Sequence, residues 1–133
     1  MKHAPQARRF LPGLLAGDIL VVFLFVAMGM TSHLTWNGPL SLFPASFPFL
    51  LAWLVWGLVL GLFRAGTVRT IPVSIRTAIA GWALAAPTGV AIRMLILGRA
   101  PHWSFWLTAF VFGGAMLVVW RGIAAWYAGR RAV

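Results

Sequence analysis

The 133-residue sequence contains no cysteine and only one acidic residue, Asp18. Without cysteine, the chain can form no disulfide, no thiolate metal site and no cysteine nucleophile. A single acid also excludes catalysis by a pair of carboxylates. Charged residues make up 9% of the chain, whereas a soluble domain carries about 25%. The sequence therefore lacks the polar surface that a water-soluble domain needs.

The chain is instead rich in apolar residues. Hydrophobic residues make up 62% of the chain, and its mean hydropathy is +0.92. A small globule buries only about two-thirds of its surface, so a soluble fold could not hide this much apolar area. The 11 basic residues give a net charge of +10, but they lie between long apolar runs. This arrangement is typical of a polytopic membrane protein and argues against nucleic-acid binding.

Four apolar runs have the length that a membrane-spanning helix needs, about 17–25 residues. We predict helices over residues 10–30, 47–63, 73–97 and 103–127. They indicate an all-α fold, a compact bundle of four transmembrane helices that forms a single domain over residues 1–133. A cleaved signal peptide is the alternative for the first run. That run is longer than the usual apolar core of about 7–15 residues, however, and Asp18 interrupts it.

Prolines are expected to mark the start of the second helix and a bend in the third. Residues 31–47 are rich in proline and other turn formers, which predicts a loop, because repeated prolines remove helical hydrogen bonds. Ser46 followed by Pro48 is typical of a helix start, with a capping residue and a proline in the first turn. Pro87 should bend the third helix, because its ring displaces the carbonyl of Ala83.

The basic residues between the runs orient the bundle. With four crossings, the positive side chains of the N-terminal tail, of residues 64–76 and of the C-terminal end all fall on one side. Arg93 and Arg99 fall on the other side. Cytoplasmic loops of membrane proteins carry an excess of Lys and Arg. We therefore predict a multi-pass protein of the cytoplasmic membrane of a bacterium, surrounded by the lipid bilayer, with both termini in the cytoplasm.

Small residues at four-residue spacing indicate where helices pack closely. Gly57 and Gly61 form such a pair on the second helix, and Gly81, Ala85 and Gly89 continue the spacing on the third. In lipid, close approach of two backbones supplies much of the packing energy between helices. Gly57 and Gly61 therefore form either a homo-oligomer face or, as such motifs do more often, an ordinary contact within the chain.

Asp18 is the most informative residue, because it lies about two turns inside the first helix. A charge at that depth costs about 2.5–3.5 kcal/mol on insertion scales, so something must offset it. Arg76 in the third helix and Arg121 in the fourth lie near the same end of the bundle and could reach it. Asp18 then belongs to an internal ion pair, or is protonated and bonded to a neighbour, or forms a proton or cation site.

A second polar group is expected at the other end of the bundle. Ser32 and His33 end the first helix on one stripe with Asp18, and Arg93 lies about one turn from the end of the third. If these helices face each other, Ser32, His33 and Arg93 form an outer cluster suited to anion binding or proton relay. Otherwise Arg93 extends to the outer headgroups and His33 merely ends a helix.

Metal, cofactor and enzyme interpretations find little support. No two of the histidines, His3, His33 and His102, share a helical face, and two histidines without a carboxylate are a weak ligand set. The chain has no phosphate-binding glycine loop and no nucleophile elbow. We expect no metal, no cofactor and no enzymatic activity.

Several short motifs together resemble one family. They are Asp18 early in the first helix, Gly29 through Ser32-His33 at its end, Pro48-Phe49 opening the second, Arg93 closing the third and Trp120-Arg121 near the end of the fourth. Over residues 10–121 the chain resembles domain-of-unknown-function family 3054, small predicted membrane proteins of bacteria with relatives in plastids. The family pattern has an arginine just before the Ser-His pair, where this chain has Met30 and Thr31, which argues against an outer site of two arginines. The resemblance implies the membrane architecture and no activity.

Two functions remain open. Asp18, Arg93 and the proline in the third helix slightly favour a small transporter or channel-like protein, acting as an oligomer because four helices enclose little space. The alternative is a non-catalytic subunit or assembly factor of a larger membrane complex. The small size, the glycine faces and the lack of catalytic groups indicate this second function.

Overall fold

The computed structural model describes residues 9–32, 38–98 and 103–131, which are helical almost throughout. The helices are α2 (Pro12–Ser32), α3 (Leu42–Leu60), α4 (Ile71–Leu97), and a last run of α5 (Trp103–Thr108), the π-helix η3 (Ala109–Gly113) and α6 (Gly114–Arg131). Short 3-10 turns, η1 (Pro39–Ser41) and η2 (Ala65–Val68), precede α3 and α4. This described part contains no strand, so the all-α prediction is confirmed.

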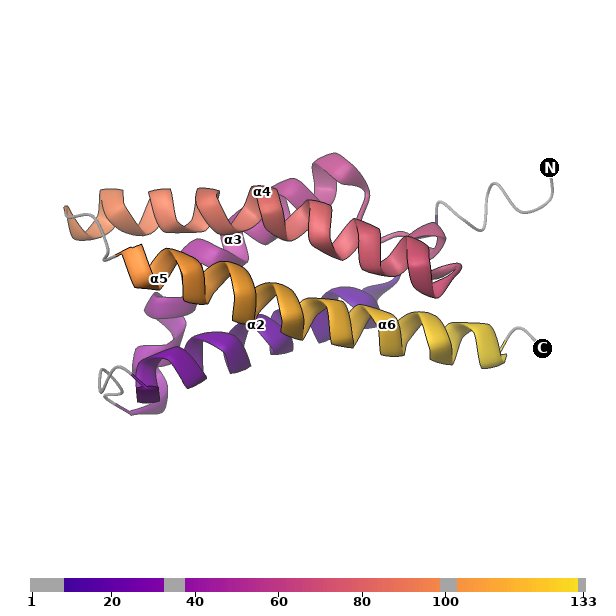
Figure 1. Cartoon of the computed structure of the whole chain (residues 1–133), viewed down its shortest axis with the longest axis horizontal. Coiled ribbons are helices and arrows are strands. Elements are labelled where there is room, and N and C mark those ends of the chain that lie inside the picture. Colours follow the sequence, from indigo (N-terminus) through magenta and orange to yellow (C-terminus); the bar gives the residue numbers. More distant parts are fainter. Residues whose placement is uncertain (1–8, 33–37, 99–102, 132–133) are drawn as a thin grey trace.

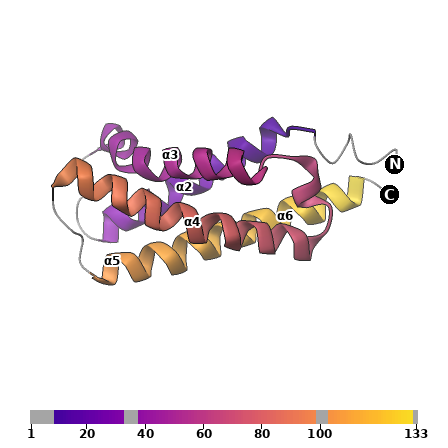
Figure 2. The same cartoon turned by 90° about the horizontal axis from the view of Figure 1, so that it is seen from above.

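The helices lie side by side along one long axis and form a bundle (Figure 1). The start of α2 and the end of α6 lie at the same end of this bundle, as the view turned by 90° also shows (Figure 2). Four stretches are long and apolar enough to cross a membrane: Pro12–Thr31, Pro39–Leu60, Ile71–Leu97 and Trp106–Arg130. The prediction of a four-helix polytopic membrane protein is therefore confirmed.

The second membrane helix begins earlier than the predicted residue 47. After η1, α3 already starts at Leu42, so the expected loop over 31–47 is too long. A proline in the first helical turn removes no hydrogen bond, because the first N–H groups of a helix have no carbonyl partner within it. Pro44 lies in that first turn, and Pro48 lies inside the helix. The helix α3 therefore begins before both prolines.

The same helix ends at Leu60, before the predicted residue 63. Gly61 follows with φ 70°, a left-handed conformation that glycine adopts easily, and its N–H donates to the Gly57 carbonyl. The chain then turns back, and the ring of Phe63 lies against Gly57. Gly57 and Gly61 are therefore no docking face on one helix. Gly57 is covered by a side chain of its own chain, and Gly61 caps the helix.

An aromatic cluster fills the middle of the bundle. Phe25 of α2 meets Phe49 of α3 and Trp82 of α4 edge to face, with ring centroids 5.7 and 5.8 Å apart. Trp82 also lies 6.2 Å from the ring of Phe49 and 6.2 Å from that of Trp53. Aromatic pairs at such separations contribute about 0.5–1.5 kcal/mol beyond the area they bury. The cluster joins three of the four membrane helices.

Small residues of α4 allow these rings to reach its backbone. A Cβ on Gly89 would stand 2.7 Å from a ring carbon of Phe49, and one on Gly81 would stand 2.5 Å from a methyl carbon of Leu62. Ala85 lies between them and is fully buried. The predicted stripe of Gly81, Ala85 and Gly89 thus serves packing between α4 and α3 within one chain.

The last membrane helix contains a π-helical turn that the sequence did not predict. The turn spans Ala109–Gly113, and the indole Nε1 of Trp82 donates to the Ala109 carbonyl at 2.9 Å. The same indole lies directly on Gly113, where a Cβ would overlap it. A π turn shifts the helical hydrogen-bond pattern. Here the turn lies against the indole of Trp82, which occupies the space between α4 and the last helix.

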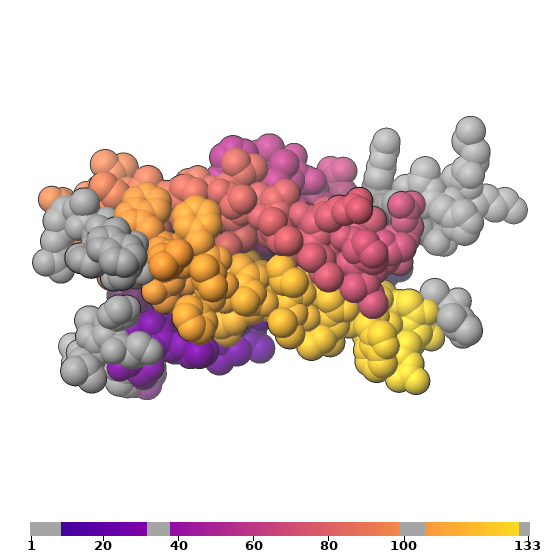
Figure 3. Space-filling model, in the orientation of Figure 1, coloured from indigo at the N-terminus to yellow at the C-terminus, as the bar shows by residue number. Residues whose placement is uncertain are grey.

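The outer surface of the bundle is apolar. Large hydrophobic side chains are exposed on each membrane helix, among them Leu20, Leu24, Leu58, Val59, Ile79, Val119 and Ile123. Figure 3 shows the face on which α4 and α6 run side by side. The four membrane-crossing stretches are only 22–33% buried inside the bundle. Contact with lipid accounts for this surface, since a membrane protein has no need to hide it from water.

Candidate functional site

Asp18 lies in the second turn of α2 and is fully buried between three helices. Its carboxylate accepts four hydrogen bonds. Oδ1 accepts from Arg121 Nε at 3.0 Å and from Trp120 Nε1 at 2.9 Å. Oδ2 accepts from Arg121 Nη2 at 2.5 Å and from Trp53 Nε1 at 3.0 Å. The arginine therefore donates two parallel hydrogen bonds to the carboxylate. Each carboxylate oxygen also accepts one hydrogen bond from an indole N–H.

Arg121 of α6 is fully buried too and connects further parts of the chain. Its Nη1 donates to the Leu62 carbonyl at 2.7 Å and to Thr67 Oγ1 at 3.3 Å, both in the connection between α3 and α4. Its own carbonyl accepts from Ser74 Oγ of α4 at 2.6 Å. The guanidinium carbon lies 5.7 Å from the ring centroid of Trp53. Arg121 thus links α2, α3, α4 and α6 through its side chain and its main-chain carbonyl.

This geometry decides between the two structural interpretations of Asp18. A protonated carboxyl needs an acceptor for its proton, whereas all four groups that face Asp18 are N–H donors. The structure therefore contains an internal ion pair with Arg121. Breaking such a buried pair from one side leaves an uncompensated charge, which costs about 3–5 kcal/mol.

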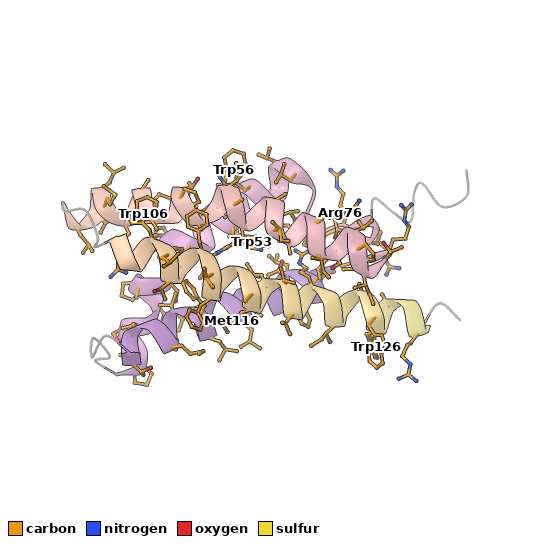
Figure 4. The ribbon with its side chains drawn as sticks, viewed as in Figure 1. Trp53, Trp56, Arg76, Trp106, Met116 and Trp126 are labelled. Carbon is orange, nitrogen blue, oxygen red and sulfur yellow. The ribbon has the colours of Figure 1, made fainter. Side chains whose placement is uncertain are left out.

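Arg76 was the other expected partner of Asp18, and this expectation is wrong. Its side chain is exposed and lies on the outer face of α4 (Figure 4). Helical spacing explains the difference, because the neighbouring turns of α4 direct Ser74 and Ala78 inward, and both are buried. Residue 76 therefore falls on the opposite face of the helix.

The sequence did not single out most of the groups that satisfy the ion pair. Trp53 lies in the middle of α3, where its indole is fully buried rather than at a membrane interface. Figure 4 shows Trp53 inside the bundle and Trp126 at its periphery. The available signal was an indole N–H far from the ends of an apolar run, since such a donor needs a partner in lipid. Trp120 next to Arg121 carried the same signal.

The expected outer cluster stays a prediction. Ser32 ends α2, but its side chain and the whole of His33 lie outside the described residues. Arg93 is half-buried near the end of α4. The ends of α2 and α4 lie at the same end of the bundle (Figure 1). The three histidines considered above as metal ligands also lie outside the described residues. Among the residues that are described, no three His, Cys, Asp or Glu residues come together.

One buried polar group stands apart from the ion pair. Ser46 of α3 is fully buried, and its hydroxyl has no hydrogen-bond partner within the described part of the chain. The sequence pattern predicts that this serine caps a helix start, but α3 begins earlier, at Leu42. It instead lies in the second turn of the helix.

The bundle defines the protein as a small polytopic membrane protein whose single acid is held in an internal ion pair. Residues 15–124 match the family described as protein of unknown function (DUF3054). The chain belongs to this family, and the predicted resemblance is confirmed. Both Asp18 and Arg121 lie inside the matched region. No curated protein and no solved structure matches the chain.

Proposed function

We propose that this protein is a non-catalytic subunit or assembly factor of a larger membrane complex. One observation carries the proposal: the only acidic side chain of the protein is fully committed to holding its own helices together. An acid that carries protons or cations must expose an oxygen to them. Both oxygens of Asp18 are instead occupied by donors from α3 and α6.

The packing of the bundle supports the same proposal. The ion pair and the aromatic cluster fix all four membrane helices relative to one another, which gives a rigid body with an apolar outer surface. The chain has no cysteine and no second acid to supply catalytic groups. A rigid lipid-facing body without such groups suits a role in contact and stability rather than in chemistry.

Site-specific photocrosslinking in intact membranes tests this proposal. A photoreactive residue at Leu58 of α3 or Val119 of α6, which are 69% and 61% exposed, should form a defined adduct with another membrane protein. The same residue at Leu117 of α6, which is buried, is the matched control and should form none. Gentle detergent extraction should recover the same partner. A chain that always runs as a monomer, with no protein adduct from either exposed position, contradicts the proposal.

A small transporter or channel-like protein acting as an oligomer is the second candidate. The observation that favours it is the π-helical turn Ala109–Gly113, since such turns are frequent at functional sites. It faces α4, which also contains Pro87. Reconstituted vesicles test this function directly. Fluxes of protons and small ions equal to those of protein-free vesicles would remove the candidate, and a flux that Gly113→Ala changes would support it.

We further propose that the protein lies in the cytoplasmic membrane of a bacterium with both termini in the cytoplasm. The exposed arginines gather at the end of the bundle where α2 begins and α6 ends, as cytoplasmic sides usually require. The natural chain has no cysteine, so single-cysteine variants report one position each. On intact cells an impermeant maleimide should label Leu40→Cys and leave Gly129→Cys unlabelled until the membrane is opened. The reverse pattern would invert the topology.

A further inference from the structure

Four exposed arginines gather at the end of the bundle where α2 begins. They are Arg9 before α2, Arg64 after α3, Arg69 after η2 and Arg76 in the second turn of α4. We propose that this basic patch binds the headgroups of anionic phospholipids. The proposal concerns a surface distinct from the ion pair and does not depend on the proposed function.

Backbone contacts bring the first two arginines together. The amide of Ala65 donates to the Arg9 carbonyl at 2.8 Å, and Phe10 and Arg64 form an isolated antiparallel bridge. Arg69 follows the η2 turn, whose Thr67 contacts the ion pair. The segments that carry these arginines are therefore fixed to the bundle and to each other. The patch is therefore part of the folded bundle.

The chain cannot neutralise this patch itself. Asp18 is its only acidic side chain, and that carboxylate is buried and bound to Arg121. Among the described residues, no arginine of the patch has an acidic partner. The protein carries a net charge of +10, so anions from outside must approach these guanidinium groups. The patch therefore stays positively charged and attracts external anions to this end of the bundle.

The depth of the patch favours lipid headgroups over a soluble polyanion. The arginines flank the membrane-crossing stretches that end at Leu60 and begin at Ile71. Arg76 lies about 7.5 Å inside the latter, by the helical rise, within reach of the headgroups for a long side chain. Trp126 is half exposed at the same end, with the guanidinium of Arg130 4.7 Å from its ring centroid. Exposed tryptophan beside basic residues is typical of the headgroup level.

Arginine suits this ligand chemically. Its planar guanidinium donates two parallel hydrogen bonds to a phosphate, and it keeps its charge at every physiological pH. Several guanidinium groups in one basic patch can bind a phosphodiester. They also favour lipids with a net negative charge over zwitterionic lipids. Anionic phosphatidylglycerol in the adjacent leaflet fits these requirements.

Lipid competition measures the selectivity of the patch. The full chain is incorporated into nanodiscs of phosphatidylglycerol and phosphatidylcholine in equal amounts, then extracted gently, and its retained lipids are counted by native mass spectrometry. The wild-type protein should retain phosphatidylglycerol preferentially. Arg69→Gln with Arg76→Gln should lower that preference about five-fold for each arginine removed, the order expected for one basic residue near an anionic surface. Arg69→Lys with Arg76→Lys keeps the charge and should retain most of the preference.

Three results would overturn the proposal. One is equal retention of both lipids by the wild-type protein, and another is a preference that the glutamine variant keeps in full. The third is binding of a short single-stranded oligonucleotide that phosphatidylglycerol does not displace, which would assign the patch to a nucleic acid. Size-exclusion profiles and tryptophan fluorescence like those of the wild type establish that the variants are folded.

Discussion

Replacing Asp18 with asparagine tests how much of the fold depends on the ion pair. The carboxylate accepts four hydrogen bonds, two of them from Arg121. Asparagine keeps one acceptor oxygen and places an amide NH2 where the other oxygen was. In either orientation this NH2 faces two N–H donors at 2.5–3.0 Å. Two donors then lose their acceptor, and the buried guanidinium loses its counter-charge.

The expected loss of stability follows from these contacts. Removing one partner of a buried ion pair costs about 3–5 kcal/mol. Hydrogen bonds between membrane helices contribute less than in water-soluble cores, on average about 0.6 kcal/mol, so we expect a value near the lower limit. In the double variant Asp18→Asn, Arg121→Gln no charge remains unpaired. Its loss should therefore be about 0.5–3 kcal/mol smaller than the sum of the two single losses, the usual range for residues in contact.

Unfolding in mixed micelles gives these free energies. The purified protein is titrated with dodecyl sulfate, and tryptophan fluorescence follows the transition, because Trp53 and Trp120 both donate to the carboxylate under test. The single variants should unfold at lower detergent fractions than the wild type, and the loss in the double variant should be smaller than the sum of the two single losses. Single variants within about 0.5 kcal/mol of the wild type, the range of an ordinary surface change, would refute the assignment of the pair as the main connection of the bundle.

Three further predictions use the same unfolding assay. Gly17→Ala should lower the free energy of unfolding by about 1–3 kcal/mol, because the added methyl would overlap an indole ring. Gly122→Ala is its control and should be neutral or stabilising, because nothing lies within 4 Å of the added methyl. Ser46→Ala should leave stability unchanged or raise it by up to about 1 kcal/mol, since it removes a buried hydroxyl that has no partner in the described structure; a large loss would reveal a missing contact. Arg76→Gln should change stability by less than about 0.5 kcal/mol, in contrast to Arg121→Gln, and a loss equal to that of Arg121→Gln would return Arg76 to the ion pair.

The architecture was predictable because the bilayer imposes it through composition. Helix number follows from long apolar runs, and the arrangement of both chain ends at one end of the bundle follows from an even number of crossings. The start of α3 was not predictable in the same way. Prolines at positions 44 and 48 favour a loop when the sequence is read alone. In the structure the first helical turn accepts Pro44 at no cost in hydrogen bonds, and the helix continues through Pro48.

The ion pair was only half predictable. An acid in an apolar run requires a partner, which left Arg76 and Arg121 as candidates at suitable depth. The rotation of α4 and α6 about their axes decides between them, and the π-helical turn Ala109–Gly113 contributes to that rotation in the last helix. Periodicity in the sequence contains no signal for such a turn. Whether the indoles of Trp53 and Trp120 reach Asp18 likewise depends on how α3 and α6 are rotated about their axes.

The separation of the two charges along the chain has a consequence for how the protein is made. Asp18 and Arg121 are 103 residues apart. At a synthesis rate of about 5–20 residues per second, the first helix waits about 5–20 s before its guanidinium partner leaves the ribosome. During that interval the nascent acid lacks the guanidinium that neutralises it in the folded bundle. The first helix therefore enters the membrane before the partner that fixes its place in the bundle has been made.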